Sequence, residues 1–230
     1  MVPRNEPEIL PRETAADGVY RALKRDITTL KHRPGTALVE HQLASLYGTS
    51  RVPVREACRR LQQQGLLTSR PFKGYAVAQI SLKEIGDCFD LREVLEAHAL
   101  EMASRRATAE DLQRLGHLAA TQYTYHDLES YIDFLERNLD FHIDLAALSG
   151  NDRLVSVLRG LLGGMQRFFF LGLDLGDFAS EMRSEHEELV RLLLDGQREA
   201  AVGCLRRQIR ASRDRILRAL FDNPIDLPLE

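Results

Sequence analysis

The stretch from Thr36 to Val77 constrains this chain more than any other feature, because a helix start lies there between a turn and two strand-like segments. The helix should begin at Ser50, whose hydroxyl can accept a bond from a first-turn N–H, and Pro53 is tolerated in that turn. Downstream apolar residues recur at i, i+3, i+4 and i+7, which predicts one buried stripe. Its members are Val54, Ala57, Cys58 and Leu61.

A row of arginines lies off this stripe, with Arg51, Arg55 and Arg59 repeating every four residues. A lone row of this kind is usually a solvated helix face. Ahead of it, however, an apolar segment (Leu43, Ala44, Leu46) and the turn Tyr47-Gly48-Thr49 give helix-turn-helix spacing. The spacing therefore favours a helix that enters a DNA groove over a merely solvated one.

A β-hairpin should follow this helix. Residues 66–70 and 75–77 predict two strands, joined by the tight basic turn Pro71-Phe72-Lys73-Gly74. We expect Arg51 and Arg55 to reach base edges, with Arg59 nearer the phosphates. Contacts to the DNA backbone are expected from His41, Ser50, Lys73 and Gly74, the glycine allowing close approach.

These residues resemble the winged helix-turn-helix domain of GntR-type bacterial transcription regulators. The resemblance covers about forty contiguous residues without a gap, from Leu38 through Gly48-Thr49-Ser50-Arg51 to Gly74-Tyr75-Ala76-Val77. It implies a DNA-binding regulator. Because one winged helix reads few bases, we expect a homodimer on an inverted-repeat operator in double-stranded DNA.

Charge is divided unevenly along the chain. Residues 1–80 contain 13 Lys and Arg against 7 Asp and Glu, whereas residues 81–230 contain 18 against 27. A basic half indicates a polyanionic partner for that half. With no apolar run of eighteen and no N-terminal signal pattern, the chain is expected to be cytoplasmic, without a membrane partner. Its three cysteines show no metal or disulfide spacing and should be small buried hydrophobes.

The predicted fold is mainly α. We expect a disordered leader over 1–12, a winged helix-turn-helix domain over 13–80, an effector-binding and dimerisation domain over 81–222 and a tail over 223–230. The first domain should add a helix from Thr14 to Lys31 and a strand at Leu38-Val39. Short loops in the second domain predict an antiparallel bundle of six or seven helices. Six are expected, at Leu82–Arg105, Ala109–His126, Leu128–Leu148, Arg153–Leu173, Phe178–Leu194 and Arg198–Leu220.

The second domain resembles the FCD-type effector domain of the FadR subgroup of GntR regulators. The matching motifs are Leu91-Arg92, Leu95-Glu96, Phe141-His142, Ser149-Gly150-Asn151 and Glu185-His186. Many members hold a divalent metal with one Asp and three His. Carried over by position, the ligands here would be Asn138, His142, His186 and Gln208. Two are neutral amides, and Asp140 points about 200° round the helix from His142, so it cannot replace them.

The resemblance therefore implies weak binding of zinc or nickel, or none, with these side chains holding an effector directly. Structural histidines are the alternative. Arg92 is the candidate to grip an effector carboxylate, and an ion pair with Glu96 is its alternative role. Arg167 is a second candidate. Gly163-Gly164 before it should admit a close neighbour or kink the helix.

The histidines and carboxylates of the second domain allow an enzyme to be compared with a regulator. A metal-dependent all-α hydrolase needs charged ligands and an open water position, and no carboxylate lies at ligand spacing to His142 or His186. The sequence instead predicts a regulator and not an enzyme, most simply a repressor released from its operator by a small carboxylate metabolite. A response to an acyl-type ligand, or activation in place of repression, remains open.

Overall fold

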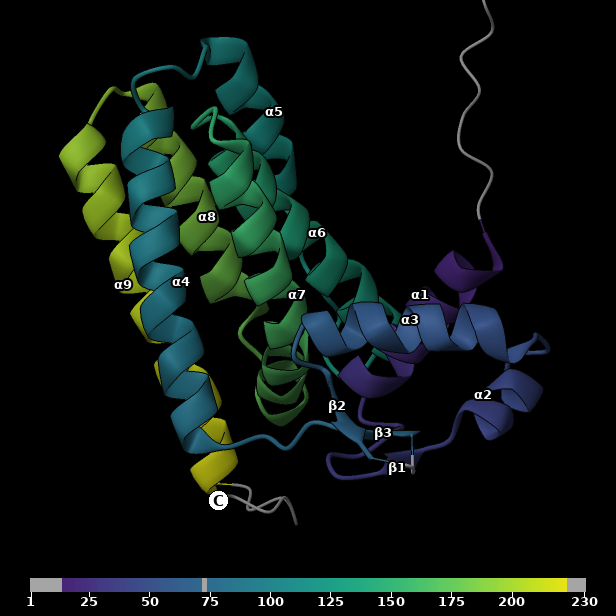
Figure 1. Cartoon of the computed structure of the whole chain (residues 1–230). Helices are drawn as coiled ribbons and strands as arrows, with labels where there is room; N and C mark the ends of the chain where they lie inside the picture. Colours follow the sequence, from purple (N-terminus) through teal and green to yellow (C-terminus); the bar gives the residue numbers. More distant parts are fainter. Residues whose placement is uncertain (1–13, 72–73, 223–230) are drawn as a thin grey trace, which may run out of the picture.

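The computed structural model describes residues 14–71 and 74–222, and it has two parts that differ in architecture (Figure 1). A compact α/β module precedes an upright bundle of long helices. The predicted mainly-α fold, a winged helix-turn-helix followed by a helical bundle, is confirmed. The predicted leader over 1–12 and the tail over 223–230 lie outside the described residues.

The first part places a small sheet under three helices. Strands β1 and β2 both pair antiparallel with β3, so the order is β1-β3-β2. The register sets Leu38 opposite Tyr75 and Arg70 opposite Gly74. Its elements are α1 (Ala15–Thr28), β1 (Ala37–Leu38), α2 (Glu40–Leu46), α3 (Arg51–Gln63), β2 (Leu67–Arg70) and β3 (Gly74–Val77).

Local chemistry sets the ends of these elements. Helix α1 begins at a capping box, in which Thr14 and Asp17 satisfy each other's backbone N–H groups. It ends at Thr28 rather than at the predicted Lys31, because Leu30 adopts a positive φ of 58° that an α-helix cannot include. Val39 is the N-cap of α2 and not a strand residue. Leu46 belongs to the predicted apolar segment, but unlike Leu43 and Ala44 it is exposed.

The second part is an antiparallel bundle with its own hydrophobic core. Among the described residues its helices are α4 (Leu82–Ala103), α5 (Ala109–Ala119), α6 (Leu128–Ala147), α7 (Asp152–Leu175), α8 (Ala179–Leu194) and α9 (Arg198–Asp222). Buried Phe89, Phe134 and Phe168 belong to one cluster that spans them. The core of the first part is a separate cluster around Leu23, Val54 and Leu61.

Helix α5 is much shorter than the predicted Ala109–His126. It stops at Ala119, and the segment that follows contains β-branched and aromatic residues of low helix propensity. There Tyr123 is buried and its hydroxyl accepts a bond from the Phe178 backbone N–H at 2.6 Å. His126 adopts a positive φ of 63°. Tertiary contacts therefore override the helical pattern in this segment.

Helix α7 lies at the centre of the bundle and also contacts the first part of the molecule. It is the one described helix long and apolar enough to span a membrane by composition, but most of it is buried as bundle core. A Cβ added to Gly164 would lie 2.5 Å from the backbone oxygen of Gln64, the C-cap of α3. The glycine pair thus admits a close neighbour, and that neighbour is the end of α3.

Candidate DNA interface and effector site

Helix α3 presents its arginine row to solvent. Val54, Ala57, Cys58 and Leu61 are fully buried, as the predicted stripe requires. Arg51, Arg55 and Arg59 are all exposed. The C-terminal end of α3 lies against the bundle, whereas its N-terminal end, next to α2, points away from it (Figure 1). The end of the helix that begins with Arg51 is therefore free to enter a DNA major groove.

Arg55 is held in place by a partner that sequence reasoning missed. Its Nε and one terminal nitrogen donate to the two carboxylate oxygens of Glu40 at 2.9 and 2.7 Å. The hydrogen bonds to Glu40 raise the pKa of Arg55, and the same contact lowers the pKa of Glu40. Fifteen residues separate the two, so no helical spacing indicated this pair. Such a fork fixes the guanidinium plane before DNA arrives.

A second missed residue is Val52, whose side chain is 72% exposed between Arg51 and Pro53. A large apolar side chain at this end of a recognition helix can contact a thymine methyl group. The signal was present in the sequence, since Val52 lies off the buried stripe. Val52 therefore joins Arg51 and Arg55 as a candidate for base contact.

The other residues predicted to contact DNA are Ser50, His41, Lys73 and Gly74, and their surroundings differ. Ser50 is at the N-cap of α3, but its hydroxyl makes no capping bond, so the helix start does not depend on it. His41 is exposed on α2, and Lys73 lies outside the described residues. Gly74 has a φ of 87°, and a Cβ there would lie 2.7 Å from the Leu38 carbonyl oxygen. Its close approach is therefore to β1.

Inside the bundle, Arg92 of α4 takes part in a buried three-residue network. Its Nε donates to Glu96 at 2.5 Å, and a terminal nitrogen lies 2.9 Å from Nε2 of His142 on α6. Glu96 also bonds Nδ1 of His142 at 2.7 Å. The side chains of Arg92 and Glu96 are only 4% and 2% exposed. The ion pair with Glu96, given above as the alternative role of Arg92, is therefore present in the bundle core, and Glu96 belongs to the site.

This network determines the protonation of its members. Burial would raise the pKa of Glu96, but Arg92 and His142 outweigh it and hold that pKa at about 2. Burial lowers the pKa of His142, with Glu96 opposing and Arg92 adding to the shift. A neutral His142 that donates from Nδ1 to Glu96 and accepts at Nε2 from Arg92 satisfies every contact.

His186, Asn138 and Gln208 join this network around one small cavity. The imidazole rings of His142 and His186 are 5.3 Å apart between centroids, and Phe141 stacks on His186 at 4.3 Å. Burial and the neighbouring His142 and Arg92 hold the pKa of His186 well below its usual range. The cavity measures about 20 Å³ and is lined by all four residues predicted by position together with Arg92. It has room for about one water molecule.

The donor set does not fit a divalent metal. Both nitrogens of His142 are engaged, one by Glu96 and one by the cationic Arg92, which an incoming metal ion would have to displace. Asn138 and Gln208 contribute neutral oxygens that cannot balance the ion's charge. Among the described residues, no three His, Cys, Asp or Glu side chains converge as metal ligands would.

Arg167 does not belong to this cavity, which corrects its prediction as an effector ligand. Its two terminal nitrogens donate to the carbonyl oxygens of Ala78 and Gln79 at 2.7 and 3.1 Å, and one also contacts Glu84 at 2.8 Å. It therefore ties α7 to the linker between the two parts. The contact joins residues almost ninety positions apart, so the sequence pattern could not indicate it.

Similarity to known proteins agrees with this arrangement. Residues 15–77 match the family of bacterial regulatory proteins named gntR, and residues 87–211 match the FCD domain. The chain is 30% identical over 189 residues to the Escherichia coli HTH-type transcriptional repressor GlaR, covering 79% of this chain and 86% of that protein. It is 29% identical over 184 residues to the Bacillus subtilis uncharacterized HTH-type transcriptional regulator YdhC, covering 79% and 82%.

Among solved structures, Escherichia coli McbR/YncC shares the fold with a TM-score of 0.71 at 23% identity, covering 90% of this chain and 98% of that one. The relatives are transcription regulators, in keeping with a basic winged helix that an enzyme would not require. The chain therefore belongs to the GntR family of bacterial transcriptional regulators, in the FadR subgroup with an FCD domain, and is a DNA-binding regulator and not an enzyme.

Proposed function

We propose that this regulator is a cytoplasmic repressor that binds an inverted-repeat operator as a homodimer and is released by a small organic acid. The effector enters the cavity around His142 and His186. The observation that supports this site is the pair of buried amide oxygens, Oδ1 of Asn138 and Oε1 of Gln208, which have no hydrogen-bond partner. Both residues line the cavity. Unpaired buried acceptors are costly, and a ligand that donates to them recovers that free energy.

The orientation of Gln208 narrows the ligand chemistry. Its amide nitrogen donates to the Glu185 carbonyl oxygen and lies 3.1 Å from the Cys204 sulfur, so its oxygen is the atom left as acceptor. A carboxylate cannot donate to that oxygen, but a hydroxyl can. Arg92 uses its Nε and one terminal nitrogen in the contacts already described, which leaves its other terminal nitrogen for an anion. The effector is therefore a hydroxy acid, and a purely acyl ligand suits this polar lining less well.

The cavity must enlarge to admit such a molecule. A second cavity of about 20 Å³ is lined by the same Phe169, Met182, Ser212 and Arg215. Met182 is unbranched and changes rotamer easily, so its displacement joins the two spaces. The ligand acts only by preferring the enlarged packing over the closed one.

Helix α7 connects this packing to the DNA-binding part. Phe169 lines the effector cavity, Arg167 holds the linker carbonyls and Gly164 faces the end of α3. All three lie within two turns of one helix. A shift of α7 on effector entry therefore moves the linker and α3 together. In a homodimer this changes the spacing of two recognition helices that must match two half-sites. We infer repression because two Escherichia coli relatives, GlaR and RspR, are each named an HTH-type transcriptional repressor.

Operator release by defined acids tests this proposal. Fluorescence anisotropy of labelled operator is measured with lactate, tartrate and gluconate, and with propionate, succinate and hexanoate as acids without hydroxyls. We expect at least one hydroxy acid to release the operator, and Gln208→Leu to weaken that response at least tenfold with apo affinity unchanged. Release by the plain acids alone, or a full response in Gln208→Leu, would place the effector elsewhere.

A further inference from the structure

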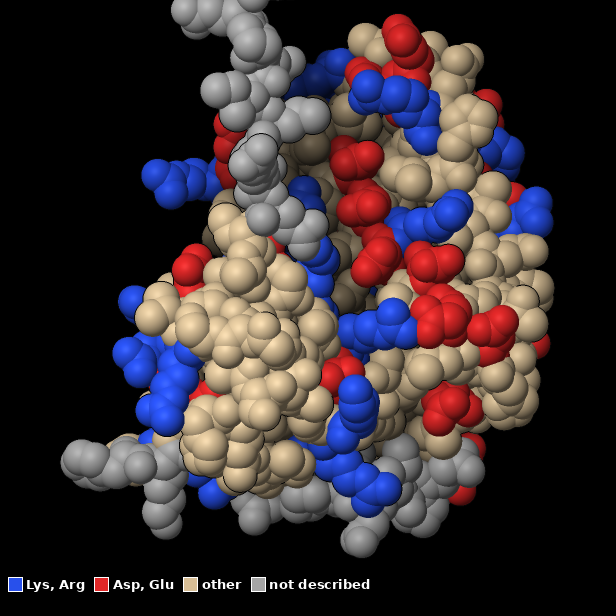
Figure 2. All heavy atoms as spheres, turned by 90° about the vertical axis from the view of Figure 1, so that its right-hand side faces the viewer, with Lys and Arg blue, Asp and Glu red and all other residues tan. Residues whose placement is uncertain are grey.

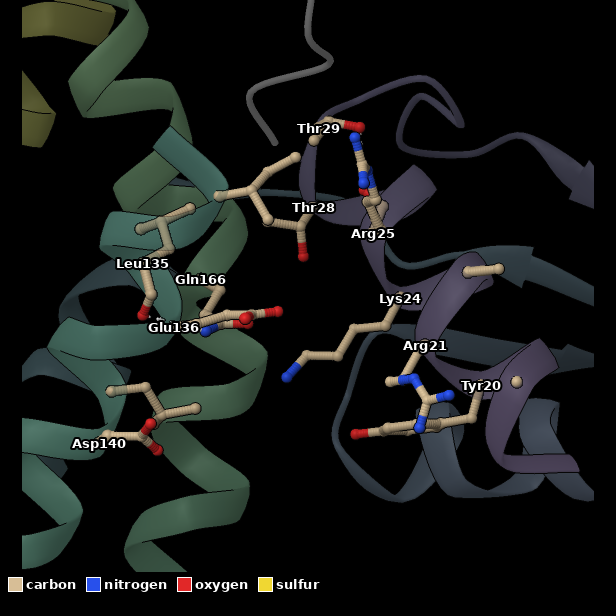
Figure 3. Close-up of a pocket in the computed structure, with 14 residues that line it drawn as sticks. Tyr20, Arg21, Lys24, Arg25, Thr28, Thr29, Leu135, Glu136, Asp140 and Gln166 are labelled. Atoms are coloured by element: carbon tan, nitrogen blue, oxygen red, sulfur yellow. Dashed lines mark hydrogen bonds between the residues drawn. The ribbon is translucent and has the colours of Figure 1, made fainter. Parts of the chain in front are cut away.

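A wide cavity lies between the two parts of the described chain and not inside the bundle. It measures about 660 Å³, and α1 forms one wall while α6 and α7 form the other (Figure 3). This volume is in the range of small-molecule sites. We propose that the cleft binds a small zwitterionic metabolite, with its anionic group on α1 and its cationic group on α6.

On the α1 wall, Lys24 points into the cleft without a partner. Its side chain extends toward α6 (Figure 3), and among the described residues no carboxylate forms an ion pair with it. Burial lowers the pKa of Lys24, since the ammonium has lost part of its hydration, while Glu136 opposes the shift from across the cleft. An anionic ligand group would supply the missing charge partner.

Thr28 provides an independent indication on the same wall. It is 6% exposed, and its hydroxyl, which points toward the cleft in Figure 3, has no hydrogen-bond partner. The adjacent Thr29 behaves in the usual helical way, because its hydroxyl donates to the Arg25 carbonyl oxygen at 2.9 Å. The Thr28 hydroxyl is therefore an unpaired buried group one helical turn from Lys24, and a bond from a ligand would offset the cost of its burial.

The α6 wall has the opposite charge. Glu136 and Asp140 lie one turn apart and line the cleft. Within the described ranges, neither has a hydrogen bond or ion pair that would neutralise it. Figure 2 shows acidic side chains facing basic ones across a hollow on this side of the molecule. At its edge Arg25 and Glu129 do close an ion pair, whereas Lys24 and Glu136 do not. A ligand with a negative group at one end and a positive group at the other therefore complements both walls, whose own charged groups do not pair with each other.

Such a ligand acts differently from the effector proposed above. It would bridge α1 of the DNA-binding part and α6 of the bundle directly, and so fix their relative orientation without opening the bundle core. Its site shares no lining residue with the His142 cavity. The two sites can therefore be tested separately.

Isothermal titration of the full chain with ω-amino acids tests the proposal. The probes are γ-aminobutyrate, 5-aminopentanoate and 6-aminohexanoate, with the corresponding carboxylates and alkylamines as single-charge analogues. We expect at least one zwitterion to bind at least tenfold more tightly than both of its analogues. Lys24→Gln and Glu136→Gln should each weaken that binding at least tenfold, and Thr28→Val should weaken it about threefold.

Matched variants distinguish binding in the cleft from binding at another place on the protein. Thr121→Val removes a hydroxyl that is already bonded to the Leu118 carbonyl oxygen outside the cleft, and Lys83→Gln removes an exposed lysine of α4, so both should leave binding unchanged. Circular dichroism of each variant verifies folding, and Thr28→Val is close to isosteric if the charge variants unfold. Binding of no zwitterion, equal binding of a single-charge analogue, or loss of binding only in His142→Ala would each overturn the proposal.

Discussion

Two arginine–glutamate pairs lie in the two different parts of this molecule, and their surroundings give them different roles. Arg55 of α3 and Glu40 of α2 are 59% and 22% exposed, whereas Arg92 and Glu96 in the bundle are 4% and 2% exposed. An exposed pair contributes little to stability and can exchange its carboxylate for another anion. A buried pair cannot lose one member without leaving an unpaired charge in the core. The first pair can be a reversible clamp, and the second is a fixed structural element.

The largest expected effect comes from breaking the buried pair. Glu96→Gln keeps the shape but leaves Arg92 without a counter-charge, so the free energy of unfolding should fall by about 3–5 kcal/mol. Denaturant unfolding measures this, with Asp87→Asn of an exposed pair on the same helix as the control that changes little. A loss below about 1 kcal/mol would show that Arg92 and Glu96 are not a core pair.

The Arg92–Glu96 pair also makes the free energy of unfolding depend on pH. The folded pKa of Glu96 is about 2, below its ordinary value of 4.5, so the folded state binds its proton less readily. The stabilisation by this carboxylate is therefore present in full above about pH 4.5 and is lost as the pH falls toward 2. In wild type the unfolding free energy should fall over this range by more than in Glu96→Gln. Parallel pH profiles of the two proteins would contradict this assignment.

At the exposed pair, removing the arginine should affect DNA and not folding. Arg55→Ala should reduce operator affinity about ten- to hundredfold and relax base preference at one position. Anisotropy titrations against the operator and single-base variants measure both. Arg60→Ala is the matched control from α3, since Arg60 bonds Asp17 at 2.7 Å and lies over the Tyr20 ring. Should Arg60→Ala relax base preference and Arg55→Ala not, the recognition face is misassigned.

Helix α7 must link the two regions if effector entry is to reach the DNA, and Gly164 tests that link. In Gly164→Ala the new Cβ meets the Gln64 backbone oxygen, so docking of the two parts should weaken by about 1–3 kcal/mol. Limited proteolysis of the linker and small-angle scattering report the loss. Gly163→Ala is the control, because its nearest neighbour would be the flexible Lys24 ammonium at 3.6 Å. If the two variants behave alike, the contact between Gly164 and Gln64 does not transmit effector binding to the DNA-binding part.

The smallest effect is expected from Glu40→Gln. Without the carboxylate, Arg55 loses its orientation but keeps its charge, so binding to nonspecific DNA should rise a few-fold while selectivity falls. Thermal unfolding should barely change, because the pair is exposed. A large loss of stability in Glu40→Gln would mean that the Arg55–Glu40 pair stabilises the fold as the Arg92–Glu96 pair does. The two pairs would then not differ in role.

The sequence alone predicted local features well and long-range ones poorly. The α3 stripe, the turn before it and the strands of the wing follow from residues within four positions of one another. The Arg92–Glu96 spacing was also visible, but its burial was not, because burial depends on four other helices. Contacts such as Arg55–Glu40 and Arg167–Ala78 join distant positions whose meeting is set by tertiary packing. Because the carbonyl partners of Arg167 lie so far away in the sequence, its own neighbourhood could not distinguish a structural role from contact with an effector.

The docking of α3 against the bundle through the Gln64 backbone oxygen and Gly164 has an evolutionary consequence. This contact is made by main-chain atoms, so it depends on the path of the helix and not on which side chains its exposed face presents. Substitutions at Arg51, Val52 or Arg55 can therefore alter operator choice without disturbing how the two parts fit together. Duplicated copies of such a gene can acquire new target promoters while retaining an inherited way of responding to metabolites.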